Sequence, residues 1–81
     1  MMSDAHAVLP LSLLAENRFG HVRIVQTDHP TRIRLLGIGI GAGSRLEVLR
    51  NRAGDMVLGQ GNNRISLGHS ITRNILVQAQ G

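Results

Sequence analysis

Residues 45–67 read RLEVLRNRAGDMVLGQGNNRISL, and they give the clearest indication of the fold. Three segments of it alternate apolar and polar residues, with Leu46 and Val48 on one face of the first. Alternation of this kind indicates half-buried antiparallel strands. Gly and Asn separate the segments, and both accept the positive φ angles of tight hairpins at little cost. The stretch therefore predicts three consecutive strands joined by turns at residues 51–55 and 61–63.

The alternation continues to both sides. Residues 21–28 predict a strand with Val22 and Ile24 on the same face, and residues 74–78 predict a closing strand. A short first strand is expected around residues 8–10, because Pro is tolerated at a strand end. We therefore expect a mainly β fold, a small barrel of five or six short antiparallel strands with two or three short helices, since closing the sheet removes exposed edges. The predicted inward-facing residues of the other strands are Leu46, Val48, Ile65, Leu67, Ile75 and Val77.

One helix has a clear start and end. Pro30 suits the first turn of a helix, because the missing N–H would have no intrahelical partner there. Ile33 and Leu36 then fall three residues apart on one side, and Gly37 predicts the end of the helix. Two shorter helical turns are expected, at residues 13–17 with Ser12 as a cap and at residues 69–73 with Ser70 as a cap.

Length and composition predict one small domain. The chain has 81 residues with one Phe and no Trp, Tyr or Cys, so the core must be aliphatic and disulfides are excluded. We expect a flexible N-terminus at residues 1–7, a single domain at residues 8–79 and a tail at residues 80–81. No secretory leader and no stretch long enough to cross a bilayer is evident, which predicts a soluble cytoplasmic protein without membrane insertion.

The net charge is positive, but it does not distinguish between classes of partner. Nine Arg and no Lys face five acidic residues, for a net charge of +4 with the four His neutral. This balance suits an acidic protein, a nucleic acid or an anionic membrane surface. Single-strand binding by small barrels relies on several stacked aromatic rings, and Phe19 alone cannot supply them. We therefore expect no nucleic-acid partner.

The glycine-rich segment Gly37–Gly43 invites a phosphate-loop interpretation that its surroundings exclude. Gly43 is followed by Ser44 and Arg45 rather than by Lys and a hydroxyl residue, and the segment leads from a helix into a strand. A structural role is predicted instead, with a helix end and a tight crossing of the chain. Ile38 and Ile40 are expected to plug the barrel from this loop.

No pattern predicts catalysis or a built metal site. The five acidic residues are dispersed, and no pair or triad with catalytic spacing is present. No cofactor is expected, and contact with a transition metal such as Fe or Zn would be weak and made by surface His, because a preformed site needs three or four convergent ligands. The four imidazoles are His6, His21, His29 and His69.

In order and spacing, the elements resemble those of the FeoA family, small proteins of bacterial ferrous iron uptake with an SH3-like barrel. The likeness covers roughly residues 9–77. It departs at Ile38, where Met is common, at Ala42, where Pro is usual, and at Thr72, where Ala is frequent. The segments that carry it are Leu11–Leu14 with Gly20, Arg34–Ile40, Gly43 before residues 44–49, and Ile65–Leu67 followed by Ile75–Val77.

The resemblance implies a function. It implies a non-enzymatic cytosolic accessory protein that modulates the membrane transporter FeoB through the transporter's cytoplasmic GTP-binding region. The same fold occurs as a metal-linked regulatory domain, and a basic SH3-like or Sm-like nucleic-acid module is a further alternative. An enzymatic role would require stimulated GTP hydrolysis by FeoB. The residues predicted to contact the partner are Arg32, Arg34, Leu36, Ile38 and Gly39.

Overall fold

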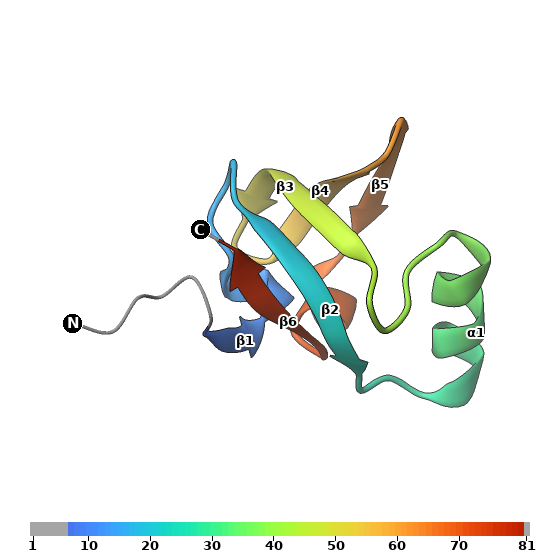
Figure 1. The fold of residues 1–81 in the computed structure, drawn as a ribbon. Coiled ribbons are helices and arrows are strands. Elements are labelled where there is room, and N and C mark those ends of the chain that lie inside the picture. Colours follow the sequence, from blue (N-terminus) through green and yellow to red (C-terminus); the bar gives the residue numbers. More distant parts are fainter. Residues whose placement is uncertain (1–6, 81) are drawn as a thin grey trace.

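The computed structural model describes residues 7–80, which form six strands and three short helices (Figure 1). Residues 1–6 and Gly81, which include most of the predicted flexible N-terminus and half of the predicted tail, lie outside the described residues. The strands are β1 (Val8–Pro10), β2 (Phe19–Val25), β3 (Arg45–Arg52), β4 (Asp55–Gln60), β5 (Asn63–Leu67) and β6 (Ile75–Gln80). The helices are the 3₁₀ turn η2 (Leu11–Leu13), α1 (His29–Gly37) and α2 (His69–Thr72).

The strands form one antiparallel sheet in the order β1-β6-β2-β3-β4-β5. Figure 1 shows this sheet curled around itself, with α1 standing to one side of it. The predicted mainly β architecture of short antiparallel strands with short helices is confirmed. Within residues 7–80 the first and last strands of the sheet, β1 and β5, do not pair with each other. Both are therefore edge strands.

Both predicted hairpins are present, and their turns set the register. Ala53 and Gly54 have φ angles of 52° and 93°, as a two-residue turn with two left-handed positions requires. In the next turn Gly61 has a φ of 57° at the first central position, which a residue with a Cβ rarely adopts. Gln60 therefore pairs with Asn63, and the hydrophobic alternation of β4 and β5 stays on one face.

The core is aliphatic, as the composition predicts. The predicted inward positions of β3 and β6 have no exposed surface, Leu67 is buried, and Ile65 is only partly buried. The one buried polar side chain among the described residues, Thr72, donates a hydrogen bond from Oγ1 to the carbonyl of Gly54 at 2.6 Å, so its hydroxyl costs little to bury. The buried hydrophobic residues are Leu11, Leu14, Val22, Leu35, Ile40, Leu46, Val48, Met56, Leu58, Leu67, Ile75, Val77 and Ala79.

Two predictions for the N-terminal part of the domain, residues 8–28, were wrong. Val22 and Ile24 do not share a face, because the pairing of β2 with β6 shifts between them and Ile24 becomes exposed. An extra residue in one strand reverses the faces that follow it. The first helical turn covers residues 11–13 rather than 13–17, and Pro10, not Ser12, precedes it.

Helix α2 begins at His69 as predicted, but its cap is not Ser70. The Oδ1 of Asp55 accepts a hydrogen bond from the His69 backbone N–H at 2.8 Å, so the start of β4 satisfies the first turn of α2. Asp55 lies 14 positions before His69 in the sequence, whereas capping rules consider only the residues next to the helix start.

Asn51 joins the N-terminal turn to the β3–β4 hairpin. Its Nδ2 donates to the carbonyls of Ser12 and Leu14 at 3.0 and 2.9 Å. Its Oδ1 accepts from the N–H of Gly54 at 2.8 Å, and its own N–H donates to Oε2 of Glu16 at 2.8 Å. One side chain therefore satisfies three backbone groups that strand pairing leaves without a partner.

Candidate functional site: the surface of helix α1

Helix α1 lies beside the barrel rather than across it. In Figure 1 it stands apart from the sheet, joined by one connection to β2 and another to β3. Leu35 is its only buried residue. A helix that buries one side chain leaves most of its circumference available to a partner.

Local chemistry fixes both ends of α1. Pro30 occupies the first turn, as predicted, and Asp28 lies at the N-cap in an extended conformation. At the other end Gly39, with a φ of 91°, donates its N–H to the carbonyl of Leu36 at 3.0 Å. Ile40 donates its N–H to the carbonyl of Leu35 at 2.8 Å. These two bonds form a Schellman motif, with Gly39 as its left-handed residue and the fully buried Ile40 as its hydrophobic anchor.

The loop after α1 is held by a side chain of its own and by one from β4. The carbonyl of Gly39 accepts a hydrogen bond from Ser44 Oγ at 2.9 Å and another from Gln60 Nε2 at the end of β4. Ser44 Oγ also accepts from the N–H of Gly41 at 3.0 Å. The C-terminal end of α1 is thereby tied to the β4–β5 hairpin, and the glycine-rich segment has the structural role predicted for it.

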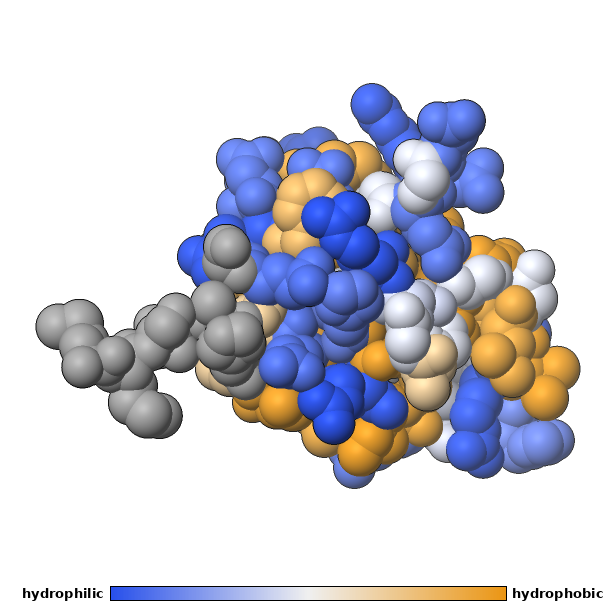
Figure 2. All heavy atoms as spheres, in the orientation of Figure 1, coloured by the Kyte–Doolittle hydropathy of each residue, from blue (hydrophilic) through white to orange (hydrophobic). Residues whose placement is uncertain are grey.

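Three large apolar side chains on or next to α1 are exposed. Ile33, Leu36 and Ile38 are 51%, 54% and 47% exposed. Arg32 and Arg34 are exposed as well, and because they lie two residues apart they project from opposite sides of α1. Figure 2 shows apolar atoms gathered over the α1 side of the molecule, with hydrophilic atoms beside them. We call these five residues the α1 surface.

Four of the five predicted partner residues have exposed side chains on or next to α1. Leu36 and Ile38 are exposed, so the prediction that Ile38 plugs the barrel was wrong, and Ile40 alone does so. Gly39 holds the loop through its backbone. Ile33 was not among the predicted contacts, although it lies about 200° around the helix from Leu35 and therefore points outward.

An open cleft adjoins the α1 surface. Its volume is about 530 Å³, and it lies between Ile38 and the β4–β5 hairpin. Asn62, Asn63, Arg64 and Ile65 form its opposite wall. Two apolar and three polar side chains therefore line the cleft, a mixture that is common in protein-binding sites.

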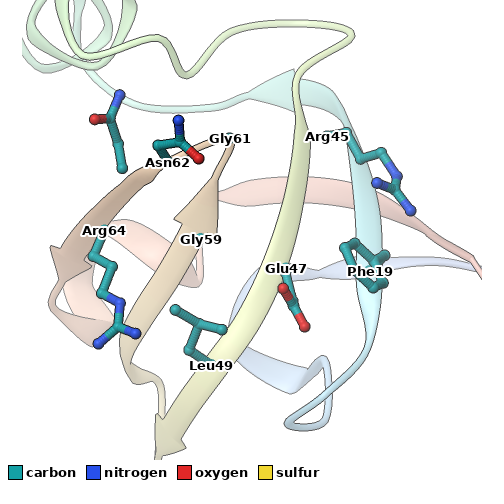
Figure 3. Close-up of a pocket in the computed structure, with 9 residues that line it drawn as sticks. Phe19, Arg45, Glu47, Leu49, Gly59, Gly61, Asn62 and Arg64 are labelled. Carbon is teal, nitrogen blue, oxygen red and sulfur yellow. The ribbon is translucent and has the colours of Figure 1, made fainter.

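A second cleft, of about 500 Å³, lies on the outer face of β3 and β4 (Figure 3). The guanidinium carbon of Arg45 lies 4.0 Å from the centre of the Phe19 ring, and Arg45 Nε donates to Gln80 Oε1 at 3.1 Å. Glu47 is the single carboxylate among the cleft's lining residues. Paired acids for general acid–base chemistry are thus not assembled in it. Arg45 covers one face of Phe19, which limits stacking of a base on that ring.

Within residues 7–80 no group of three or more His, Asp or Glu side chains is placed to hold a metal ion. His21, His29 and His69 come from β2, α1 and α2, and His6 lies outside the described residues. No helix in the described part of the chain is long and apolar enough to cross a membrane.

The sequence matches the FeoA domain over residues 9–79. The chain belongs to the FeoA family. Over 69 residues it is 28% identical to a Fe(2+) transport protein A of Methanocaldococcus jannaschii, a match that spans 85% of this chain and 84% of the relative.

Solved structures share the fold of this FeoA domain. An iron uptake regulatory protein named FeoA matches with a TM-score of 0.83 at 24% identity over 90% of this chain and 99% of its own. The FeoA protein of Chlorobium tepidum matches with a TM-score of 0.81 at 24% identity, over 90% of this chain and 71% of its own. A manganese-dependent transcriptional repressor matches with a TM-score of 0.78 at 26% identity, over 91% of this chain but 42% of its own.

Two neighbouring glycines of the α1 loop are expected to respond oppositely to alanine. Gly39→Ala should lower the free energy of unfolding by about 1–2 kcal/mol, because its φ of 91° is unfavourable for a residue with a Cβ. An added Cβ would also lie 2.6 Å from Gln60 Oε1. Gly37→Ala should raise it by about 0.4–1 kcal/mol, because the position is helical and its Cβ would meet open space. Urea unfolding followed by circular dichroism measures both; equal effects would contradict the prediction.

Proposed function

We propose that this FeoA-family chain is a non-enzymatic accessory protein of ferrous iron uptake, and that its α1 surface docks on the cytoplasmic GTP-binding region of FeoB. Family membership and the similarity to a Fe(2+) transport protein A support the link to iron transport. The docking site rests on one observation. Ile33, Leu36 and Ile38 are about half exposed on a helix that projects from the barrel.

Exposed apolar side chains have a cost that burial against a partner removes. Each of these three side chains leaves roughly half of its surface in water, where apolar surface is unfavourable by about 25 cal/mol per Å². Neighbouring apolar residues rimmed by charge are typical of protein-binding surfaces. Arg32 and Arg34 would add attraction to an acidic partner surface and would mainly accelerate association.

Charge reversal of the α1 surface is expected to weaken docking. The double variant Arg32→Glu with Arg34→Glu should bind detergent-solubilised FeoB about tenfold more weakly, because two favourable charges become repulsive. Its melting temperature should change little, since both side chains are exposed. Surface plasmon resonance with the full chain in solution measures the affinity.

A matched control changes the same charge elsewhere. Arg50→Glu with Arg52→Glu alters two exposed arginines, also two residues apart, on β3. This variant should bind FeoB within about twofold of the wild type at about 0.15 M salt, where distant charges are screened. Equal weakening by both variants would mean that net charge alone governs binding, and unchanged binding by the first would remove the α1 surface.

A metal-linked regulatory role is the second candidate. The 26% identity to a manganese-dependent transcriptional repressor favours it, although this chain spans less than half of that protein. Stimulation of FeoB by the isolated chain, without a metal added to the chain, would favour the accessory role over the regulatory one.

A further inference from the structure

Strand β5 has one side without a strand neighbour. The sheet ends at β5, which pairs only with β4 in the described part of the chain. Gln60 and Asn63 close a two-residue turn and form a hydrogen-bonded pair, and such pairs alternate along an antiparallel ladder. The backbone N–H and C=O groups of Arg64 and Ser66 therefore point away from β4, and both residues are exposed.

The two faces of this edge differ. Ile65 lies on the core side, only partly buried, and shares the 530 Å³ cleft with Ile38. Arg64 lies on the opposite face, where it also lines the second cleft (Figure 3). Because side chains alternate along a strand, a strand added here would place every second residue against the two Ile side chains and the others beside Arg64.

The charged side chains on α1 and β5 are all arginine, and the nearest acidic residue in the clefts that Arg64 lines is Glu47 of the neighbouring strand β3. Helix α1 and strand β5 together carry Arg32, Arg34 and Arg64 and contain no Asp or Glu. An acidic segment would therefore meet no like charge on either element, whereas a second copy of this chain would bring the same arginines to the same edge. A charged residue on an edge strand also opposes self-pairing.

We propose that the edge of β5 binds an extended segment of a partner protein, in which acidic and aliphatic residues alternate, as an additional strand. Main-chain hydrogen bonds to Arg64 and Ser66 supply the affinity, and the cleft between Ile38 and Ile65 selects an aliphatic side chain. The proposal rests on the proposed function for the identity of the partner, because it describes how a protein docked at α1 extends onto the neighbouring strand.

The direct test uses a peptide and the full chain. The probe is an acetylated peptide Glu-Ile-Glu-Val-Glu-Ile-Glu-Gly, added to isotope-labelled protein and followed by NMR. We expect a Kd of about 0.1–1 mM, in the range of a few main-chain bonds and one apolar contact. At saturation the amide protons of Arg64 and Ser66 should exchange at least about tenfold more slowly. The same peptide with Lys replacing Glu should bind more weakly.

Two substitutions at one position separate strand addition from other contacts. Ser66→Pro removes the outward N–H and disturbs no β4 bond, because Pro is tolerated on the free side of an edge strand. It should weaken peptide binding at least about tenfold, whereas Ser66→Ala, which keeps the N–H, should bind within about twofold of the wild type. If Ser66→Pro does not fold, slower exchange of the Arg64 and Ser66 amides in the wild type with peptide tests strand addition.

Absence of binding at about 1 mM peptide would overturn the proposal, as would equal binding by Ser66→Pro and Ser66→Ala or spectral changes confined to another face.

Binding of the variants to FeoB distinguishes failure of strand addition from failure of the proposed function. Loss of FeoB binding by the α1 charge reversal but not by Ser66→Pro would overturn strand addition and leave α1 docking intact. Loss of FeoB binding by Ser66→Pro but not by Ser66→Ala would support both α1 docking and strand addition at β5. If no variant changed FeoB binding, the proposed docking on FeoB would be overturned. The peptide titration would still test strand addition at β5, because it does not involve FeoB.

Discussion

Replacing Ile40 by Ala is expected to lower the free energy of unfolding by about 2–5 kcal/mol. The Ile40 side chain has no exposed surface, and it anchors the loop that carries α1 to the core. Its removal leaves a cavity that the rigid barrel can fill only in part. Because the chain has no Trp or Tyr, urea unfolding is best followed by circular dichroism.

The matched control lies two residues away. Ile38→Ala removes the same atoms from a side chain that is 47% exposed, so the free energy of unfolding should change by at most about 0.5 kcal/mol. The contrast tests whether the alternating Gly and Ile residues send one side chain inward and the other outward. Similar losses at both positions would show that Ile38 packs into the core and would weaken its assignment to the α1 surface.

Asn51→Ala is expected to cost about 2–3 kcal/mol, because the carbonyls of Ser12 and Leu14 and the N–H of Gly54 lose their partner together. Each of the three bonds is partly buried, so water replaces the amide incompletely. Loss of these bonds should also raise the hydrogen-exchange rate of Gly54 before the chain unfolds globally. Urea unfolding and NMR measure the two effects.

Asn51→Asp refines this prediction. It keeps the shape of the side chain and an acceptor for Gly54, but places a carboxylate against two carbonyl oxygens. The variant should be at least as unstable as Asn51→Ala at neutral pH, because unlike an amide a carboxylate cannot donate. Asn62→Ala, at an exposed position of the other turn, is the control and should change the free energy by at most about 0.5 kcal/mol. A stable Asn51→Asp variant would show that the amide donor matters little.

The strands and turns were predictable because their signals are local. Alternation with period two identifies the buried residues of β3 and β6. Gly54 and Gly61 have the positive φ angles that the predicted hairpin turns require. The resemblance to the FeoA family was confirmed by the domain match over residues 9–79. Its departure at Ile38 lies on the α1 surface, so it changes a residue available to a partner rather than one of the core.

The errors arose where a distant residue decides a local outcome. Ile24 is exposed because the pairing of β2 with β6 shifts beside it, and periodicity in one strand cannot reveal how its neighbour pairs. Helix α2 is capped by Asp55 from β4 rather than by Ser70 within its own first turn. Neither partner is close enough in sequence for a capping or alternation rule to find it.

Composition and periodicity were enough to predict an aliphatic barrel of short strands with a helix between Pro30 and Gly37, because backbone geometry and burial act over a few neighbouring residues. Which side of that helix faces the barrel depends on contacts between distant parts of the chain. Ile33, Leu35 and Leu36 are equally apolar in sequence, and it is the connection to the core through Ile40 that turns Leu35 inward and leaves the other two exposed. The free edge of β5 is likewise a property of the strand order, which arises from contacts across the whole sheet.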